Sequence, residues 1–112
     1  MVKDEISFPD FQKLDLRVGK VVKAENLEGS SSLIRMTVDL GEEYGKRKII
    51  AGIARWYKCE DLKGKKFIFV ANLAPKQMMK EMSIGMILCA DLEGKAKIIP
   101  VDNKIATGTV IR

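Results

Sequence analysis

The sequence predicts an all-β domain, a small antiparallel barrel or sandwich, and three observations favour this class. Apolar residues recur with a period near two in several short stretches, which is typical of half-buried strands. Turn signals rich in Gly, Ser and charged residues separate these stretches at short intervals. There is no β-α-β alternation, and 112 residues suffice for one domain, residues 1–112, with a single core.

Five core strands are expected, with short additions at the C-terminal end. The clearest alternation is Ile34, Met36, Val38 and Leu40, which predicts a strand with one buried face. Gly19, in the middle of the first strand, suggests a bulge or a sharp bend. The stretch FIFVANL is nearly all apolar and is expected to be buried on both faces. The expected core strands are 14–27, 33–41, 48–54, 67–73 and 83–92, and the additions are 96–101 and 107–112.

Three segments do not fit strands throughout. Ser7 caps a short helix over residues 8–13, with Pro in its first turn. Residues 55–66 are expected to form a helical turn and a loop. Residues 74–82 contain Pro75 and predict an exposed basic turn, in which two methionines can share one face of a helical turn.

The composition argues against most enzyme classes. There is no histidine, so the commonest general base and the commonest metal ligand are missing. Cys59 and Cys89 are isolated, and no phosphate-binding glycine loop is present. The sequence therefore predicts a non-enzymatic protein with no cofactor and no metal. No apolar run approaches the roughly 20 residues of a membrane span. Two isolated cysteines favour free thiols over a disulfide, which indicates a reducing compartment such as the cytoplasm.

The charge balance leaves two interpretations open. Twenty Lys and Arg against fifteen Asp and Glu give a net charge of +5, which fits either a solvated basic surface or a polyanion partner. Lysines cluster at 46–48, 63–66 and 76–80, where they could line a rim for phosphates. Trp56 and Tyr57 could stack bases, but packing over the end of the barrel is the favoured role of Trp56.

Five segments together resemble the tRNA-binding domain family. That family includes stand-alone dimeric tRNA-binding proteins, the C-terminal domains of many methionyl-tRNA synthetases and the export-related chaperone CsaA. The resemblance runs from Phe8 to Arg112, and it is strongest to the C-terminal domain of an archaeal-type methionyl-tRNA synthetase β-subunit. The segments are FPDFQKLDLRVG (8–19), VDLG (38–41), AGI (51–53), YKCEDLKGK (57–65) and ANLAPKQMMKEMSIGMILCAD (71–91).

The resemblance implies an OB fold, which is a five-stranded Greek-key barrel, and a homodimer that is built partly by the N-terminal segment. It implies binding of tRNA by shape, without preference for one amino-acid identity, alone or alongside a methionyl-tRNA synthetase. The alternative is a CsaA-like export chaperone that binds unfolded preproteins. A methionine-rich surface suits both partners, and the basic balance favours RNA.

The resemblance also implies site residues. Asn72, Lys76, Ser83 and Met86 match the family's binding surface, and Lys80 belongs to the same basic turn. Ser83 is expected to bond a phosphate or a 2′-hydroxyl, and Met86 to contact a base or ribose. Replacing Ser83 by Leu should then weaken tRNA binding and leave stability nearly unchanged.

One departure from the family pattern concerns a lysine. Many members carry N-A-D-K-L before the second strand, where this chain has Gly-Ser-Ser-Ser-Leu over residues 29–33. Ser32 takes the place of the lysine, which removes one expected phosphate contact. Arg35, two residues further on, is the candidate replacement.

Overall fold

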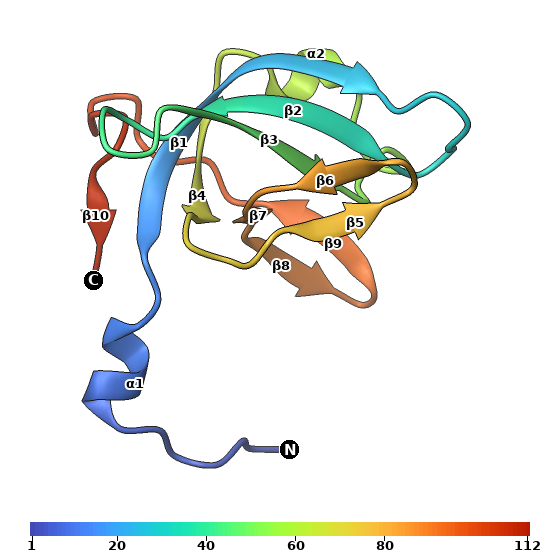
Figure 1. The fold of residues 1–112 in the computed structure, drawn as a ribbon. Coiled ribbons are helices and arrows are strands. Elements are labelled where there is room, and N and C mark those ends of the chain that lie inside the picture. The colour runs from blue at the N-terminus through green and yellow to red at the C-terminus, as the bar shows by residue number, and fades with distance from the viewer.

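A nearly closed antiparallel β-barrel carries two hairpins and an N-terminal arm in the computed structural model, which describes residues 1–112 (Figure 1). Five strands pair in the order β3-β2-β1-β4-β7, as expected for the OB-fold barrel, and β10 (Val110–Ile111) pairs with the start of β1. The strands are β1 (Leu16–Asn26), β2 (Ile34–Asp39), β3 (Lys46–Ala51), β4 (Lys66–Val70) and β7 (Met86–Ile87).

The core lies inside the barrel, where the predicted alternation of β2 is confirmed. Ile34, Met36 and Val38 are fully buried and meet Phe67 and Phe69 of β4 in one apolar cluster. The expectation that β4 is buried on both faces is wrong at its centre, because the residue between the two phenylalanines is only partly covered. A barrel strand has one inward and one outward face, and here the outward face remains half-open to solvent.

Gly19 serves close packing instead of a bulge. A Cβ atom at this position would lie 2.6 Å from Cδ1 of Phe69 and 2.7 Å from Cγ1 of Val38. Any side chain would collide with these core residues, because a packed interior has no room for an added carbon. The irregularity in pairing lies further along β1, between Val21 and Lys23.

Two short helices appear where they are expected. In α1 (Phe8–Gln12) the Ser7 hydroxyl accepts a hydrogen bond from the Asp10 amide at 3.2 Å, which confirms the cap. Helix α2 (Cys59–Leu62) joins β3 to β4, and its fully buried Leu62 packs into the core. No residue of α1 is buried, and Figure 1 shows the helix and the N-terminus projecting away from the barrel.

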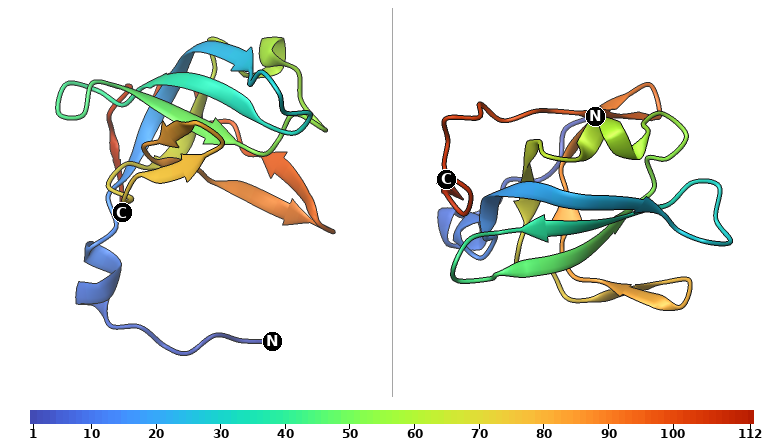
Figure 2. Two further views of the ribbon diagram at one scale, coloured as in Figure 1. Left: turned by 45° about the vertical axis from the view of Figure 1, so that its right-hand side comes forward. Right: turned by 90° about the horizontal axis from the view of Figure 1, so that it is seen from above.

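The expected helical turn over residues 74–82 is wrong, because this segment forms a β-hairpin of β5 (Lys76–Met78) and β6 (Glu81–Ser83). The expected long strand over residues 83–92 is also divided. It breaks at Gly85 and Leu88 into parts of β6, β7 and β8 (Cys89–Leu92), and β8 pairs with β9 (Lys95–Ile98) in a second hairpin. Figure 2 shows both hairpins from two further directions.

Gly85 makes the break possible. Its φ of +119° is a conformation that residues with a side chain rarely adopt. A Cβ atom there would approach the Val70 carbonyl oxygen and Cδ1 of Ile49 to 3.0 Å. The glycine therefore lets the chain leave the hairpin close over β3 and enter β7.

Both cysteines are free thiols, and they are half-buried. No helix has the length and apolar character to cross a membrane. No group of three metal-ligating side chains is present.

Candidate nucleic-acid interface

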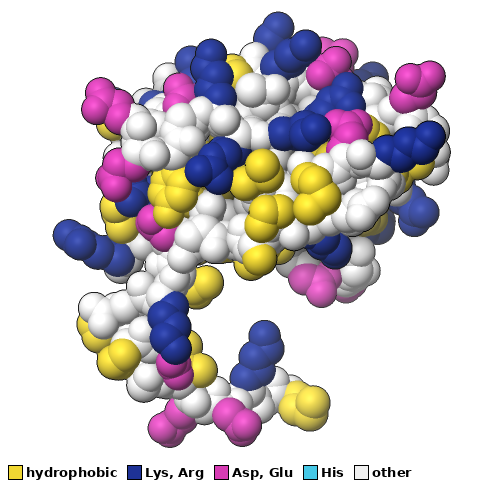
Figure 3. Space-filling view, in the orientation of Figure 1, with side chains coloured by type: hydrophobic (Ala, Val, Ile, Leu, Met, Phe, Trp, Pro, Cys, Tyr) yellow, Lys and Arg dark blue, Asp and Glu magenta, His cyan; other side chains and the backbone are white.

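The β5–β6 hairpin brings together most of the residues that the sequence nominates. Lys76 and Ser83 face each other across its strands, and Lys80 lies in its turn. Met86 follows directly in β7. On the face that carries this hairpin, hydrophobic side chains gather below a row of Lys and Arg (Figure 3). The hairpin has a hollow on each side, and the two hollows differ in character.

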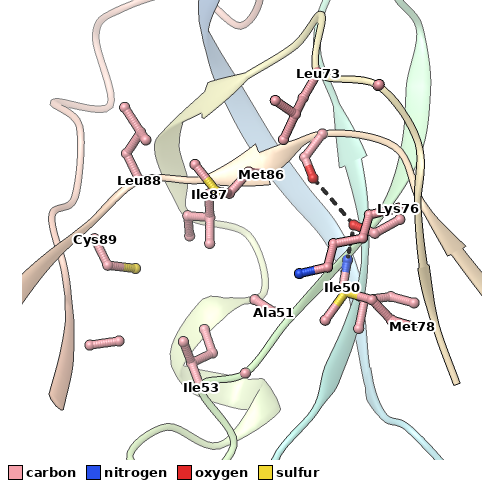
Figure 4. A pocket seen from close by; sticks show the side chains of 15 residues that line it. Ile50, Ala51, Ile53, Leu73, Lys76, Met78, Met86, Ile87, Leu88 and Cys89 are labelled. Carbon is pink, nitrogen blue, oxygen red and sulfur yellow. Dashed lines mark hydrogen bonds between the residues drawn. The ribbon is translucent and has the colours of Figure 1, made fainter. Parts of the chain in front are cut away.

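Ser83 links the β5–β6 hairpin to β3, and its hydroxyl makes two hydrogen bonds within the chain. The side chain is 3% exposed, accepts a hydrogen bond from the Ile50 amide at 2.9 Å and donates one to the Gly85 carbonyl at 3.2 Å (Figure 4). The adjacent Ile84 amide donates to the Lys48 carbonyl at 2.8 Å. Ser83 and Ile84 thus attach the hairpin to β3, and the Ser83 hydroxyl makes both of its hydrogen bonds within the chain.

Asn72 also has an internal role, at a different place. Its Oδ1 accepts from the Asp15 amide at 2.8 Å, and its Nδ2 donates to the Lys13 carbonyl at 2.7 Å. These two bonds hold the segment between α1 and β1 against the end of β4. The structure therefore places Asn72 at the root of the N-terminal arm, beside Phe11 and Ile111, and not with the hairpin.

A related network fixes the same root. Arg17 is 8% exposed, and its Nε donates to Asp15 Oδ1 at 2.7 Å. The Tyr44 hydroxyl donates to the other carboxylate oxygen of Asp15, and Arg17 also bonds the Gly108 carbonyl at 3.3 Å. The hydrogen bond from Arg17 holds the pKa of Asp15 below its usual value. The start of β1, the β2–β3 turn and the C-terminal segment are thereby joined.

Arg35 and Lys48 are paired with carboxylates of the chain itself. Glu81 accepts from Arg35 Nη1 at 2.5 Å and from Lys48 Nζ at 3.1 Å. Glu25 lies 3.4 Å from the Nε of Arg35. Hydrogen bonding from Lys48, reinforced by the charge of Arg35, lowers the pKa of Glu81. These contacts tie the hairpin to β1, β2 and β3, and they neutralise the proposed replacement for the missing lysine.

The polar cleft lies between the β1–β2 loop and the turn of the hairpin, with a volume of about 570 Å³. Met79 reaches across it, because its methyl carbon is 3.5 Å from the position of a Cβ on Gly29. Lys80 enters no ion pair. The cleft is lined by Asn26, Leu27, Glu28, Gly29, Arg35, Met79, Lys80 and Glu81.

The apolar pocket lies on the other side of the hairpin, towards β3 and β7, with a volume of about 450 Å³. Eleven of its fifteen lining residues are hydrophobic, and Lys76 is the one charged residue among them. Met86 lines it with 44% of its surface exposed. Lys76, Ser83 and Met86 thus share one pocket, while Arg35 and Lys80 share the cleft. The apolar lining includes Ile50, Ile53, Leu73, Met78, Met86 and Ile87.

The two aromatic candidates lie away from the hairpin. Tyr57 packs against the core, and its hydroxyl accepts a hydrogen bond from the Ile98 amide at 3.2 Å. Trp56 is 38% exposed in a shallow hollow beside Lys95 of the second hairpin.

Glu81, which forms ion pairs with both Arg35 and Lys48, is a residue that the sequence analysis missed. Its partners lie 33 and 46 residues earlier in the chain, so local spacing gives no sign of the pairing. The two strands of the hairpin are only three residues long each, and they show no regular alternation of apolar and polar residues, so periodicity gave no sign of them.

The chain matches a family model described as "Putative tRNA binding domain" over residues 16–110. It is 45% identical over 107 residues to a methionine–tRNA ligase of Archaeoglobus fulgidus, and 46% identical over 110 residues to one of Methanothrix thermoacetophila. These matches cover 96% and 98% of this chain but only 16% of each relative. The chain therefore spans about a sixth of the length of the curated relatives that it matches.

Solved structures share the same fold. A MetRS-related protein from Pyrococcus horikoshii superposes with a TM-score of 0.92 at 38% identity, covering 98% of this chain and 100% of that chain. The chaperone CsaA from Bacillus anthracis str. Ames gives a TM-score of 0.86 at 32% identity, covering 97% and 100%. The match over residues 16–110 and the shared barrel show that this chain belongs to the tRNA-binding domain family.

Proposed function

We propose that the chain binds tRNA through the surface of the β5–β6 hairpin, by contacts to the backbone that do not depend on sequence. Lys76 and Lys80 carry the proposal, because both are exposed on this hairpin and neither enters an ion pair. Unpaired ammonium groups on a protein of net charge +5 attract phosphates. Family membership agrees with this reading.

Retention of tRNA on filters at two salt concentrations tests the proposal. Neutralised phosphates release counterions, so the logarithm of the affinity should fall steeply and linearly with the logarithm of the salt concentration. Unfractionated tRNA and tRNAs of different amino-acid identities should bind alike. Absence of retention at low salt would refute tRNA binding, and a strong preference for one tRNA would refute the sequence-independent mode.

The N-terminal arm supports a second proposal, that two copies of the chain form a homodimer. Phe8 is 68% exposed and Ile6 67% exposed, the ring centroids of Phe8 and Phe11 are 6.3 Å apart, and helix α1 projects away from the barrel (Figure 1). Such an arm can bury its apolar side chains by packing against a second copy of the chain. Light scattering should give about twice the chain mass of 12.5 kDa, whereas a mass near 12.5 kDa would contradict the dimer.

The alternative function is that of a chaperone for unfolded preproteins. The apolar pocket is the observation that favours it, together with the likeness to CsaA structures. An apolar peptide gains little from the basic balance, so RNA is preferred. Competition decides between them: a reduced, carboxymethylated polypeptide that displaces tRNA at micromolar concentration would favour the chaperone.

The proposal also covers the compartment in which the chain acts and its protein partner. We infer a non-catalytic role for the chain, in the cytoplasm, where half-buried free thiols such as Cys59 and Cys89 remain reduced. Methionyl-tRNA synthetase is the proposed protein partner, since the curated relatives are methionine–tRNA ligases. Co-purification from the native host tests this partner, and a preparation free of synthetase would count against it.

A further inference from the structure

The apolar pocket contains a single charge with no counterion. Lys76 is its one charged lining residue, no acidic side chain lines it, and the Lys76 ammonium takes part in no ion pair. Figure 4 shows the amine reaching across the pocket, between the Met86–Ile87 side and the Ile50–Met78 side. An occupant of this pocket therefore gains from an apolar body that carries a negative charge close by.

The walls suit a flat ring better than a hydrogen-bonding group. Met78 and Met86 have flexible thioether side chains that adapt to the shape of an occupant. The one hydroxyl in the pocket belongs to Ser83, and both of its hydrogen bonds are made within the chain. About 450 Å³ lies within the usual range for small-ligand pockets. The pocket can therefore cover an apolar face, but it offers little to distinguish one base from another.

We propose that the apolar pocket receives one unstacked nucleobase of the bound RNA, with Lys76 on the phosphate of that nucleotide. This inference rests on the proposed tRNA binding and adds a site to it. A nucleotide joins a ring with apolar faces to a phosphate, which matches apolar walls beside one unpaired ammonium. An apolar peptide side chain carries no charge and would leave Lys76 without a partner. Contact with the ring faces alone makes the pocket tolerant of base identity.

Methionine methyl resonances test the pocket directly. In protein labelled at the methionine methyl carbons, saturating tRNA should move the methyl protons of Met78 and Met86 upfield, because a base stacked on them adds its ring current. Met36, which is fully buried in the core, should not move. Unmoved Met78 and Met86 methyls in a complex that forms with steep salt dependence would overturn the pocket and leave tRNA binding intact.

A variant that narrows the pocket gives an independent readout. Ala74 is exposed, lines the pocket and carries no charge. Ala74→Leu should lower the affinity for tRNA at least about threefold at fixed salt, while the salt slope stays constant because no phosphate contact is lost. Ala90→Leu, on the second hairpin outside this pocket, is the matched control and should bind as wild type. Equal affinities of the two variants would overturn the inference, and melting curves of both confirm folding.

The remaining outcomes separate the two proposals. No tRNA retention by the wild-type chain would refute the proposed function and the pocket together. If the reduced, carboxymethylated polypeptide moves the Met78 and Met86 methyls and tRNA does not, the pocket takes peptide, and the nucleobase inference is overturned.

Discussion

The polar cleft and the apolar pocket, on the two sides of the β5–β6 hairpin, hold their cations differently. At the polar cleft, Arg35 is paired with Glu81 and Glu25, and Glu81 also holds Lys48 of β3, so that Lys80 in the hairpin turn is the one unpaired cation. On the side of the apolar pocket, Lys76 stands over hydrophobic walls without any carboxylate. Both sides look equally basic in the sequence, where lysines flank the segment.

The difference shows that the number of lysines in a segment does not measure how strongly the segment can bind phosphate. A cation that is already paired must give up its carboxylate before it gains a phosphate, so its net contribution to binding is small. An unpaired cation offers its full charge and releases counterions when it binds. The β5–β6 hairpin therefore combines cations that are paired with Glu81, Arg35 and Lys48, with unpaired cations, Lys76 and Lys80, that are free to bind phosphate.

The largest expected effect is on the attachment of the hairpin, through Ser83. Ser83→Ala leaves the buried Ile50 amide without an acceptor and should cost about 1–3 kcal/mol of unfolding free energy. Ser83→Leu adds overpacking at a site that is 3% exposed, for a further cost of about 1–3 kcal/mol. Denaturant unfolding measures both variants.

Met82→Leu is the matched control, because Met82 precedes Ser83 on β6 and is 42% exposed. It should lie within about 0.5 kcal/mol of wild type. If Ser83→Leu were as stable as wild type and only bound tRNA more weakly, the sequence-based expectation would be right and the role of Ser83 in attaching the hairpin to β3 would be wrong.

This contrast shows what the sequence could and could not predict. The strand alternation at Ile34, Met36 and Val38 and the cap at Ser7 are local patterns, and the structure confirms both. The sequence predicts a basic turn over residues 74–82, because these residues suit helices, whereas the hairpin that forms there is attached to the distant β3.

The site divides in the same way. Exposed Lys76, Lys80 and Met86 lie on the surface as expected. Ser83 is buried, and Asn72, although exposed, is bonded to the backbone of Asp15 and Lys13. A serine or an asparagine can bond a backbone amide as well as a phosphate, and only the fold decides which.

The next largest effect should follow removal of the Glu81 carboxylate, which pairs with Arg35 and Lys48. Glu81→Gln frees Lys48 and one bond of Arg35, so tRNA affinity at low salt should rise, and the salt slope should steepen by about one. Filter binding over a salt series measures the slope. Glu42→Gln removes the same charge at the β2–β3 turn, at the other end of these strands (Figure 1), where Glu42 has no ion pair.

That control should change affinity much less than Glu81→Gln. Equal gains from the two variants would mean that net charge alone matters, and that Glu81 does not sequester Lys48. Lys48→Gln in the Glu81→Gln background should remove the gain, because the freed cation is then absent.

The smallest effect should be a dependence of stability on pH. The pKa of Glu81 is lowered in the folded chain, so its ion pairs stabilise the fold above the ordinary glutamate pKa of about 4.3. This stabilisation is lost as the pH falls through the lowered value. The melting temperatures of wild type and Glu81→Gln should therefore converge between about pH 6 and pH 3. A constant difference would contradict the role of the carboxylate, and Glu42→Gln should track wild type throughout.

The most direct test of the contrast compares Lys76 and Lys48, which both lie in basic clusters of the sequence. Salt slopes for tRNA binding are measured for wild type, Lys76→Gln and Lys48→Gln. Because Lys76 is unpaired and Lys48 is bonded to Glu81, Lys76→Gln should reduce the slope by about one, and Lys48→Gln should leave it unchanged. Equal reductions by the two variants, or a reduction by Lys48→Gln alone, would contradict the account.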